Sequence, residues 1–294
     1  MKNRLIPAVL ALFFASNCAF AQSTANATGI QDSLSKLSSK IWKQKTDSSR
    51  LQANAVFFKE FQSALETSSS TGITLDSIAG ITRIASEDGK IQIFTWNVPL
   101  SDGTNKYFGF IQNNLNSSVV IQLQSNTNNQ AGFDSKQFTP QEWYGAIYYK
   151  LIEVEINNQK AYTLLGWDGF TANSNRKFID IYYPDKNGNI VFGMPVFKTD
   201  KGIKTRVVLE YAEKANMLLR YDYQSIMVEK KKKLKKEDAW LIVMDRMVPM
   251  DTSMEGIRKY YVPTGDTYDG YIFRNGFWTL VENIEVANKL NLTK

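Results

Sequence analysis

The amino-acid sequence predicts an α+β protein in which N-terminal helices are followed by a large, mainly antiparallel β-sheet system. Between residues 30 and 65 apolar residues recur at helical spacing, and from about residue 81 onward short apolar strands alternate with Gly and Asn turns. Most successive strands are separated by too little chain for a crossover helix, so neighbouring strands should pair antiparallel. The 17 Phe and 14 Tyr residues also favour strands. We expect the sheets to form a sandwich or an open, curved sheet.

The first 21 residues have the pattern of a cleavable signal peptide. Lys2 and Arg4 precede an apolar run that ends in small residues, as a signal peptidase requires. The run is far shorter than the roughly 20 residues that span a bilayer, so we expect cleavage after Ala21 and no transmembrane segment in the mature chain. Lipid attachment at Cys18 is the alternative, but Asn17 stands where a small residue is expected. The sequence therefore predicts a periplasmic, outer-membrane-associated or extracellular protein.

The composition excludes several classes of function. The chain has no His, and its one Cys lies in the predicted leader. Catalytic units that need an imidazole or a thiolate, and metal centres that His or Cys would ligate, are therefore excluded from the mature chain. We expect no cofactor, no metal and no disulfide. The formal net charge of +6 is too small to indicate a nucleic-acid-binding protein.

The segment after the leader is predicted to be helical. Residues 22–29 are small and polar and should form a flexible tether, residues 30–70 the helical segment, and residues 71–294 a β-rich domain. A break between two helices is expected at residues 45–49. The two apolar stripes are Ile30, Leu34, Leu37 and Ile41, and then Leu51, Ala55, Phe58, Phe61 and Leu65. Such stripes are typical of helices that cover one face of a sheet.

Two hairpins can be assigned with their register. Asn275-Gly276 is the preferred two-residue turn and sets Phe273 opposite Trp278. If Asn157-Asn158 is the turn of the second hairpin, Glu155 lies opposite Lys160, and the apolar residues at 152, 154 and 156 share the buried face. Further strands are expected at 91–96, 107–112, 119–124, 177–183, 206–211, 217–223 and 240–247.

A run of lysines is the first feature with functional interest. Lys230, Lys231, Lys232 and Lys233 begin a basic stretch between two apolar strands. They can contact an anionic surface such as lipopolysaccharide or a lipid headgroup. The interpretation that we favour is a solvated hairpin tip whose charges discourage aggregation at the strand edges.

Aromatic residues and carboxylates supply the remaining candidates. Trp143, Tyr144, Trp167 and Asp168 are the candidate ligand-binding residues, because flat rings beside an acid can form a platform for a sugar. Alternation along strands buries many rings, so core packing is the competing interpretation for each. A glycosidase needs only two carboxylates and remains conceivable without His. Candidate acids are Asp168, Asp180, Glu153 and Glu155, but no spacing identifies a pair, so the catalytic residues stay unknown.

One stretch resembles a known group of proteins. The strand at 90–97 ends in Thr95-Trp96, follows an acidic turn at 86–89, and precedes the segment 102–109. This arrangement is similar to that of exported β-rich proteins of Bacteroidetes-type bacteria. The resemblance implies an envelope location and brings no activity with it. The resulting hypothesis is a non-catalytic envelope or extracellular protein that binds an envelope glycan or another envelope protein, and the alternative is a carboxylate-based glycan hydrolase or carbohydrate-binding protein.

Overall fold

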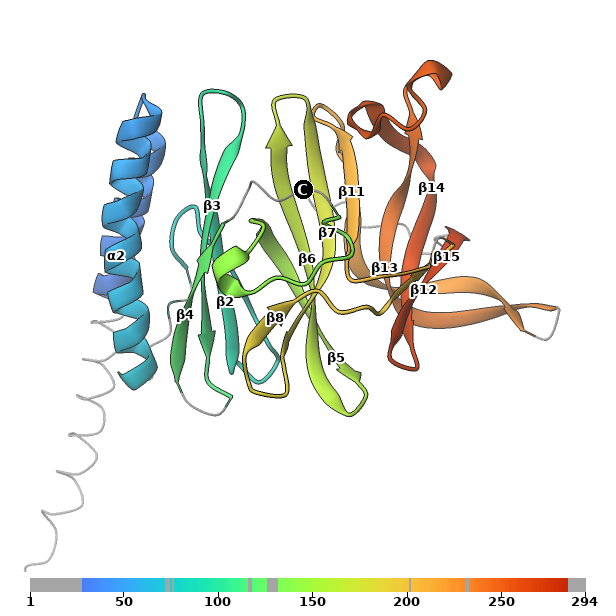
Figure 1. The fold of residues 1–294 in the computed structure, drawn as a ribbon, viewed down its shortest axis with the longest axis horizontal. Coiled ribbons are helices and arrows are strands. Elements are labelled where there is room, and N and C mark those ends of the chain that lie inside the picture. Colours follow the sequence, from blue (N-terminus) through green and yellow to red (C-terminus); the bar gives the residue numbers. More distant parts are fainter. Residues whose placement is uncertain are drawn as a thin grey trace, which may run out of the picture.

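The fold is built from four layers: a helical layer and three β-sheets stacked one behind another (Figure 1). The computed structural model describes residues 28–71, 75, 77–115, 118–125, 132–200, 202–230 and 233–284. The predicted signal peptide and Cys18 lie outside these residues. So does the predicted tether, except for Thr28 and Gly29, which belong to the first helix and not to a flexible tether.

The helical layer consists of a first helix, residues 28–43, and α2 (Asp47–Thr71). The break between them covers residues 44–46 and is shorter than the predicted one. Thr46 and Ser49 explain this, since each side-chain hydroxyl accepts a hydrogen bond from the other residue's backbone N–H, at 3.2 and 3.3 Å. This reciprocal capping starts α2 at Asp47. The helix ends at Thr71, one residue beyond the predicted end of the helical segment at residue 70.

The first sheet packs one face against the helices. It contains, in spatial order, β1 (Thr82–Ala85), β2 (Ile91–Pro99), β3 (Asn105–Asn113) and β4 (Val119–Gln124). Phe57 and Phe61 of α2 contact Trp96 with ring centroids 5.3 and 5.8 Å apart. The indole N–H of Trp96 donates to the side-chain carbonyl of Asn54 at 2.7 Å. The buried donor is therefore satisfied, and the aromatic contacts hold the helical layer in place.

The second sheet lies in the middle of the stack. It contains β11 (Val207–Ala212), β7 (Ser174–Pro184), β6 (Gln159–Thr171) and β5 (Ile147–Ile156), with β8 (Ile190–Phe192) paired to β7. The predicted β5–β6 hairpin is confirmed, with Asn157 and Asn158 at φ of 51° and 59° and Glu155 opposite Lys160. The ammonium of Lys160, however, lies 2.7 Å from the carboxylate of Glu153.

The third sheet closes the stack. Its spatial order is β10 (Gly202–Lys204), β9 (Phe197–Thr199), β15 (Phe277–Ile284), β14 (Tyr261–Arg274), β13 (Lys233–Pro249) and β12 (Leu219–Lys230). Trp278 pairs with Phe273 as predicted, around a turn in which Asn275 and Gly276 have φ of 50° and 78°. Among the described strands, β15 and β9 pair parallel, and the other paired strands are antiparallel.

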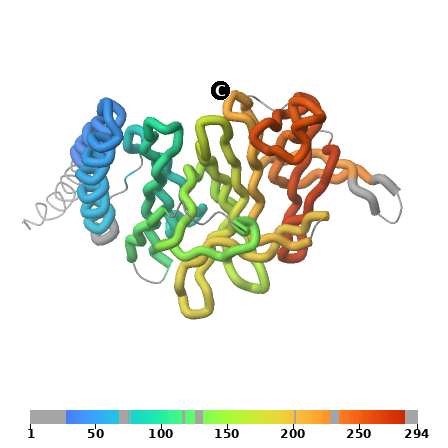
Figure 2. Tube along the Cα trace, turned by 45° about the horizontal axis from the view of Figure 1, so that its top comes forward, coloured from blue at the N-terminus to red at the C-terminus, as the bar shows by residue number. Residues whose placement is uncertain are grey.

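Two apolar interfaces join the three sheets. The first and second sheets share a core that includes Ile93, Tyr148 and Phe178, and the second and third share one that includes Ile179 and Trp278. Each interface is an ordinary sandwich core in which inward-facing side chains interdigitate. The sheets thus follow one another across the molecule (Figure 2), and the expected α+β class with stacked, mainly antiparallel sheets is confirmed.

A buried ion pair fixes the segment that precedes η1 (Pro140–Glu142). The side chains of Arg206 and Asp180 are fully buried, with Nε and Oδ2 3.2 Å apart. The guanidinium of Arg206 also donates to the backbone carbonyls of Phe133, Lys136 and Phe192. Buried charges require this kind of pairing and hydrogen bonding. Asp180, one of the candidate catalytic acids, is therefore a structural residue that is sealed from solvent.

Candidate functional site

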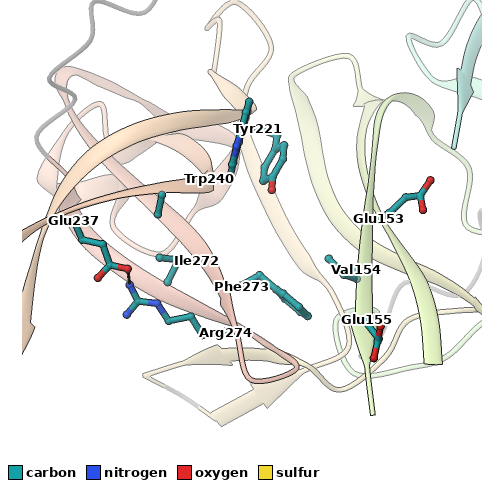
Figure 3. A pocket seen from close by; sticks show the side chains of 10 residues that line it. Glu153, Val154, Glu155, Tyr221, Glu237, Trp240, Ile272, Phe273 and Arg274 are labelled. Atoms are coloured by element: carbon teal, nitrogen blue, oxygen red, sulfur yellow. Dashed lines mark hydrogen bonds and ion pairs between the residues drawn. The ribbon is translucent and has the colours of Figure 1, made fainter. Parts of the chain in front are cut away.

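An open groove lies where the third sheet divides into two hairpins. Strand β13 begins at Lys233, but its pairing with β14 starts only at Leu241, opposite Ile272. The first part of β13 pairs with β12 alone, so these two strands form a projecting arm (Figure 2). The arm diverges from the β14–β15 hairpin, and the fork between them holds a groove of about 440 Å³ that also touches the end of β5 (Figure 3).

Aromatic side chains form one wall of this groove. Trp240 is 54% exposed and stacks on Tyr221, with ring centroids 5.1 Å apart and planes 24° apart. Tyr223, 47% exposed, is the cross-strand neighbour of Trp240 and adds a tilted ring at 5.6 Å. Figure 3 shows Trp240 and Tyr221 side by side at the lip of the groove. The three rings together are called the aromatic platform below.

The aromatic platform is anchored in the core. Tyr221 contacts the edge of Trp278 at a centroid distance of 6.4 Å, and Trp278 in turn contacts Phe273, which lies deeper in the groove. Trp278 is fully buried, and its indole N–H donates to the hydroxyl of Thr163 at 2.9 Å. The exposed ring therefore rests on rings that cannot move freely, so it presents a fixed surface and loses little entropy when a ligand binds.

Polar groups line the rest of the groove. Glu237 of β13 and Arg274 of β14 form an ion pair across the fork, 2.5 Å between Oε1 and a guanidinium nitrogen. The carboxylate of Glu153 is held by Lys160 and by the backbone N–H of Glu87 at 2.7 Å. Glu155 is exposed at the rim. The groove thus offers planar hydrogen-bonding groups beside aromatic rings, and two of its three carboxylates already have cationic partners.

A second, smaller cavity lies between the first and second sheets. It measures about 290 Å³ and is lined by Leu100, Thr104, Asn105, Lys106, Tyr107, Tyr144, Asp168 and Phe170. Asp168 comes from β6, and the hydroxyl of Tyr107 on β3 is a neighbouring donor that favours the ionised carboxylate. Burial raises the pKa of Asp168 to about 6, although the Tyr107 hydrogen bond and the charge of Arg176 act in the opposite direction. We refer to this site as the Asp168 cavity.

The sequence-predicted ligand residues do not form one site. Trp143 is fully buried between the first two sheets and donates to the hydroxyl of Tyr148 at 3.0 Å, so its ring has no face for a ligand. Tyr144 is 8% exposed and reaches the wall of the Asp168 cavity. Trp167 is half-buried beside Lys177, its cross-strand neighbour on β7. The structure therefore brings together Tyr144 and Asp168 but neither tryptophan.

The lysine run lies at the end of the projecting arm. Lys230 ends β12, Lys233 begins β13, and the two residues pair with each other. Lys231 and Lys232 lie outside the described residues. The two interpretations of the run, a solvated hairpin tip and a contact with an anionic surface, therefore both stay predictions.

Sequence reasoning missed the residues that form the groove. Tyr221 was predicted only as a strand residue, for which burial is the normal outcome, and Trp240 was one of many aromatic residues for which core packing was favoured over ligand contact. The sequence contains one signal for exposed rings: Tyr221 and Tyr223 lie on the same face of a strand that leads into the lysine run. Aromatic rings that lie near a charged hairpin end can extend beyond the area that a neighbouring sheet covers.

The remaining features of the site limit its chemistry. Within the part of the chain that the structure describes, no group of three acidic residues could hold a metal ion, and no helix is long and apolar enough to cross a membrane. No protein-family model matches the chain, and no curated protein and no solved structure is significantly similar to it. The functional conclusion therefore depends on the geometry of the two cavities.

Proposed function

We propose that this protein is an exported, non-catalytic binding protein that recognises a glycan in the groove at the fork of the third sheet. The observation that carries the proposal is the exposed Trp240 ring, held against Tyr221 at the lip of an open groove. A large exposed ring with a preorganised neighbour is costly to leave in water and is typical of a binding surface.

The chemistry of the groove suits a sugar. The C–H face of a pyranose packs on a flat ring, while its hydroxyls need donors and acceptors at the side. Trp240 supplies the ring, Arg274 supplies guanidinium donors, and Glu155 and Glu237 supply carboxylate acceptors. Because the groove is open at the surface, it suits a chain of sugar units better than one enclosed sugar.

Catalysis is the less favoured alternative. A glycosidase requires two carboxyl groups about 5 to 10 Å apart on either side of the scissile bond, and one of them must be protonated near neutral pH. In the groove, Glu153 and Glu237 are held by Lys160 and Arg274 respectively. Asp168 has the raised pKa of a general acid, but it lies in the other cavity. The acids of the described groove therefore support binding rather than hydrolysis.

Export is the part of the proposal that rests on sequence. Lys2, Arg4 and the apolar run before Ala21 support it, and so does the resemblance of the 82–109 region to exported proteins of Bacteroidetes-type bacteria. An exported glycan-binding protein would meet its ligand in the cell envelope or outside the cell.

The test compares two exposed tryptophans. Affinity electrophoresis in gels containing soluble β-glucan, xylan or mannan, together with sedimentation on peptidoglycan, should reveal binding to at least one of these glycans. Trp240→Ala should weaken that binding at least tenfold, which corresponds to the loss of a central aromatic contact. Trp42, 47% exposed in the helical layer at the opposite end of the stack, provides the matched control (Figure 1).

Trp42→Ala should bind like the wild type. The proposal is overturned if none of the glycans binds, or if Trp240→Ala binds as well as Trp42→Ala does. Release of reducing sugar by the wild-type protein would instead support the hydrolase.

A further inference from the structure

The Asp168 cavity has the features of a second binding site that is independent of the groove. It lies between the β2–β3 turn and the end of β6, on the other side of the second sheet from the third sheet. The rings of Tyr107 and Phe170 contribute to its wall, and Asp168 contributes its charged group. A partly enclosed cavity with aromatic walls and one placed carboxylate is a usual form of a small-molecule site.

The carboxylate of Asp168 has unused capacity to accept hydrogen bonds. A carboxylate can accept about four, and the neighbouring donor that favours its ionised form among the described residues is the hydroxyl of Tyr107. That hydroxyl is itself fixed, because it accepts the backbone N–H of Gly169 at 2.7 Å. Buried carboxylates are normally paired or fully hydrogen-bonded. Asp168 lines the cavity, so the cavity should favour a ligand that carries hydrogen-bond donors.

The charged groups next to Asp168 do not neutralise its carboxylate. Arg176 on β7 is the cross-strand neighbour of Asp168, but its guanidinium pairs with Glu210 of β11 at 3.4 Å and lies over the ring of Phe170 at 3.1 Å. The charges of Arg176 and Glu210 thus offset each other. Lys106 also lines the cavity, but it is exposed on β3 and its charge is screened by solvent, so Asp168 contributes the buried charge of the cavity.

We propose that the Asp168 cavity binds a small organic cation with a primary ammonium group, with the Asp168 carboxylate as its counter-ion. The ammonium would donate to the free acceptor positions of Asp168, and the alkyl part would lie against Phe170 and Leu100. Aromatic rings beside a carboxylate suit this ligand, because the ring faces also attract a cation. A neutral or anionic ligand of the same length would lose the ion pair.

The experiment uses three ligands of equal length. Butylammonium, 1-butanol and butyrate are added to the full-length mature protein at pH 7.5, and binding is followed by NMR shift changes and by thermal stability. Butylammonium should shift the resonances of residues around the cavity and raise the melting temperature, while the other two ligands should do neither. Equal responses to all three ligands would overturn the proposal.

Two variants and a control locate the site. Asp168→Asn keeps the shape of the side chain and removes its charge, so butylammonium binding should fall by at least tenfold. Phe170→Leu keeps an apolar wall without a ring and should weaken binding several-fold. Glu87→Gln removes an exposed charge in the β1–β2 turn, outside the cavity, and should leave binding unchanged. Undiminished binding by Asp168→Asn would refute the assignment even if the ligand binds.

The pH dependence provides an independent readout. Asp168 must be ionised to pair with the ammonium, and its pKa of about 6 means that the ionised fraction falls between pH 7.5 and pH 5. Affinity should therefore be about tenfold weaker at pH 5 than at pH 7.5. The other groups around the carboxylate are Arg176, Glu210, Lys106, Asp102 of the β2–β3 turn, and the hydroxyls of Tyr107 and Tyr144. Burial raises the pKa of both tyrosines above the ordinary value, so they stay neutral over this range. A pH-independent affinity would contradict the proposed counter-ion.

Discussion

The two hairpins of the third sheet each carry a tryptophan in their second strand, but the surroundings of the two tryptophans differ. The β14–β15 hairpin turns at Asn275-Gly276, and its Trp278 is fully buried against the second sheet. The β12–β13 hairpin is longer and runs past the pairing with β14, so its Trp240 is 54% exposed. The same strand pattern yields a core residue in one hairpin and a surface ring in the other.

The difference shows what decides whether a strand residue becomes core or site. Trp278 donates a hydrogen bond to Thr163 of β6 in the second sheet. The ring contacts of Trp240 are with Tyr221 and Tyr223, which belong to its own hairpin. The two tryptophans differ in exposure because the second sheet covers Trp278 but does not extend over Trp240. Four predictions follow the comparison from buried to exposed positions.

Trp278→Ala should have the largest effect on stability. It removes a buried ring, leaves a cavity and deprives the hydroxyl of Thr163 of its donor, so the free energy of unfolding should fall by about 3 to 5 kcal/mol. Chemical denaturation monitored by circular dichroism measures this. Trp278→Phe keeps most of the volume and should cost clearly less. A loss below about 1 kcal/mol for Trp278→Ala would remove the distinction between the two hairpins.

Gly276→Val should have the second largest effect. Gly276 has φ of 78°, which a β-branched residue resists, and the cost should be about 1 to 2 kcal/mol. A Cβ at this position would meet only Ile156, at 4.0 Å, so the effect is backbone strain rather than a clash. Gly29→Val, at a helical glycine with open space around it, is the control and should cost much less. Equal melting temperatures for both variants would argue against a strained turn.

The sequence predicted local structure well where turn chemistry decides it. The registers of Phe273 with Trp278 and of Glu155 with Lys160 follow from two-residue turns whose geometry leaves few alternatives. The β4 strand was also predicted at the observed bounds. These features depend on a few neighbouring residues, so one sequence is enough to recognise them.

Features that depend on how sheets stack could not be predicted in this way. Tyr107 and Asp168 are far apart in the chain and meet because the first sheet packs on the second. The exposure of Trp240 depends on where the second sheet ends, and the nearby lysine run is only an indirect signal of that end. The candidate sites therefore emerged only from the tertiary structure, although their residue types were visible from the start.

Trp240→Ala should have a small effect on stability, in contrast to its proposed effect on glycan binding. The ring is more than half exposed, so its removal mainly costs the stacking contact with Tyr221. The free energy of unfolding should change by less than about 1 kcal/mol. Denaturation of Trp240→Ala beside Trp278→Ala makes the comparison directly, and a loss as large as that of Trp278→Ala would mean that Trp240 is a structural residue.

The smallest effect is expected for the triple change of Lys231, Lys232 and Lys233 to Gln. Lys230 and Lys233 pair with each other. If the run is a solvated hairpin tip, its exposed charges contribute little to stability. The melting temperature should be nearly unchanged, and neither protein should sediment with anionic vesicles. If the run instead contacts an anionic surface, the wild type should bind such vesicles, with about 1 kcal/mol lost per lysine removed, and salt should reproduce the effect of the mutation. Salt-sensitive vesicle binding by the wild type alone would make the arm a two-part site, with its basic end on the surface and its aromatic platform on the ligand.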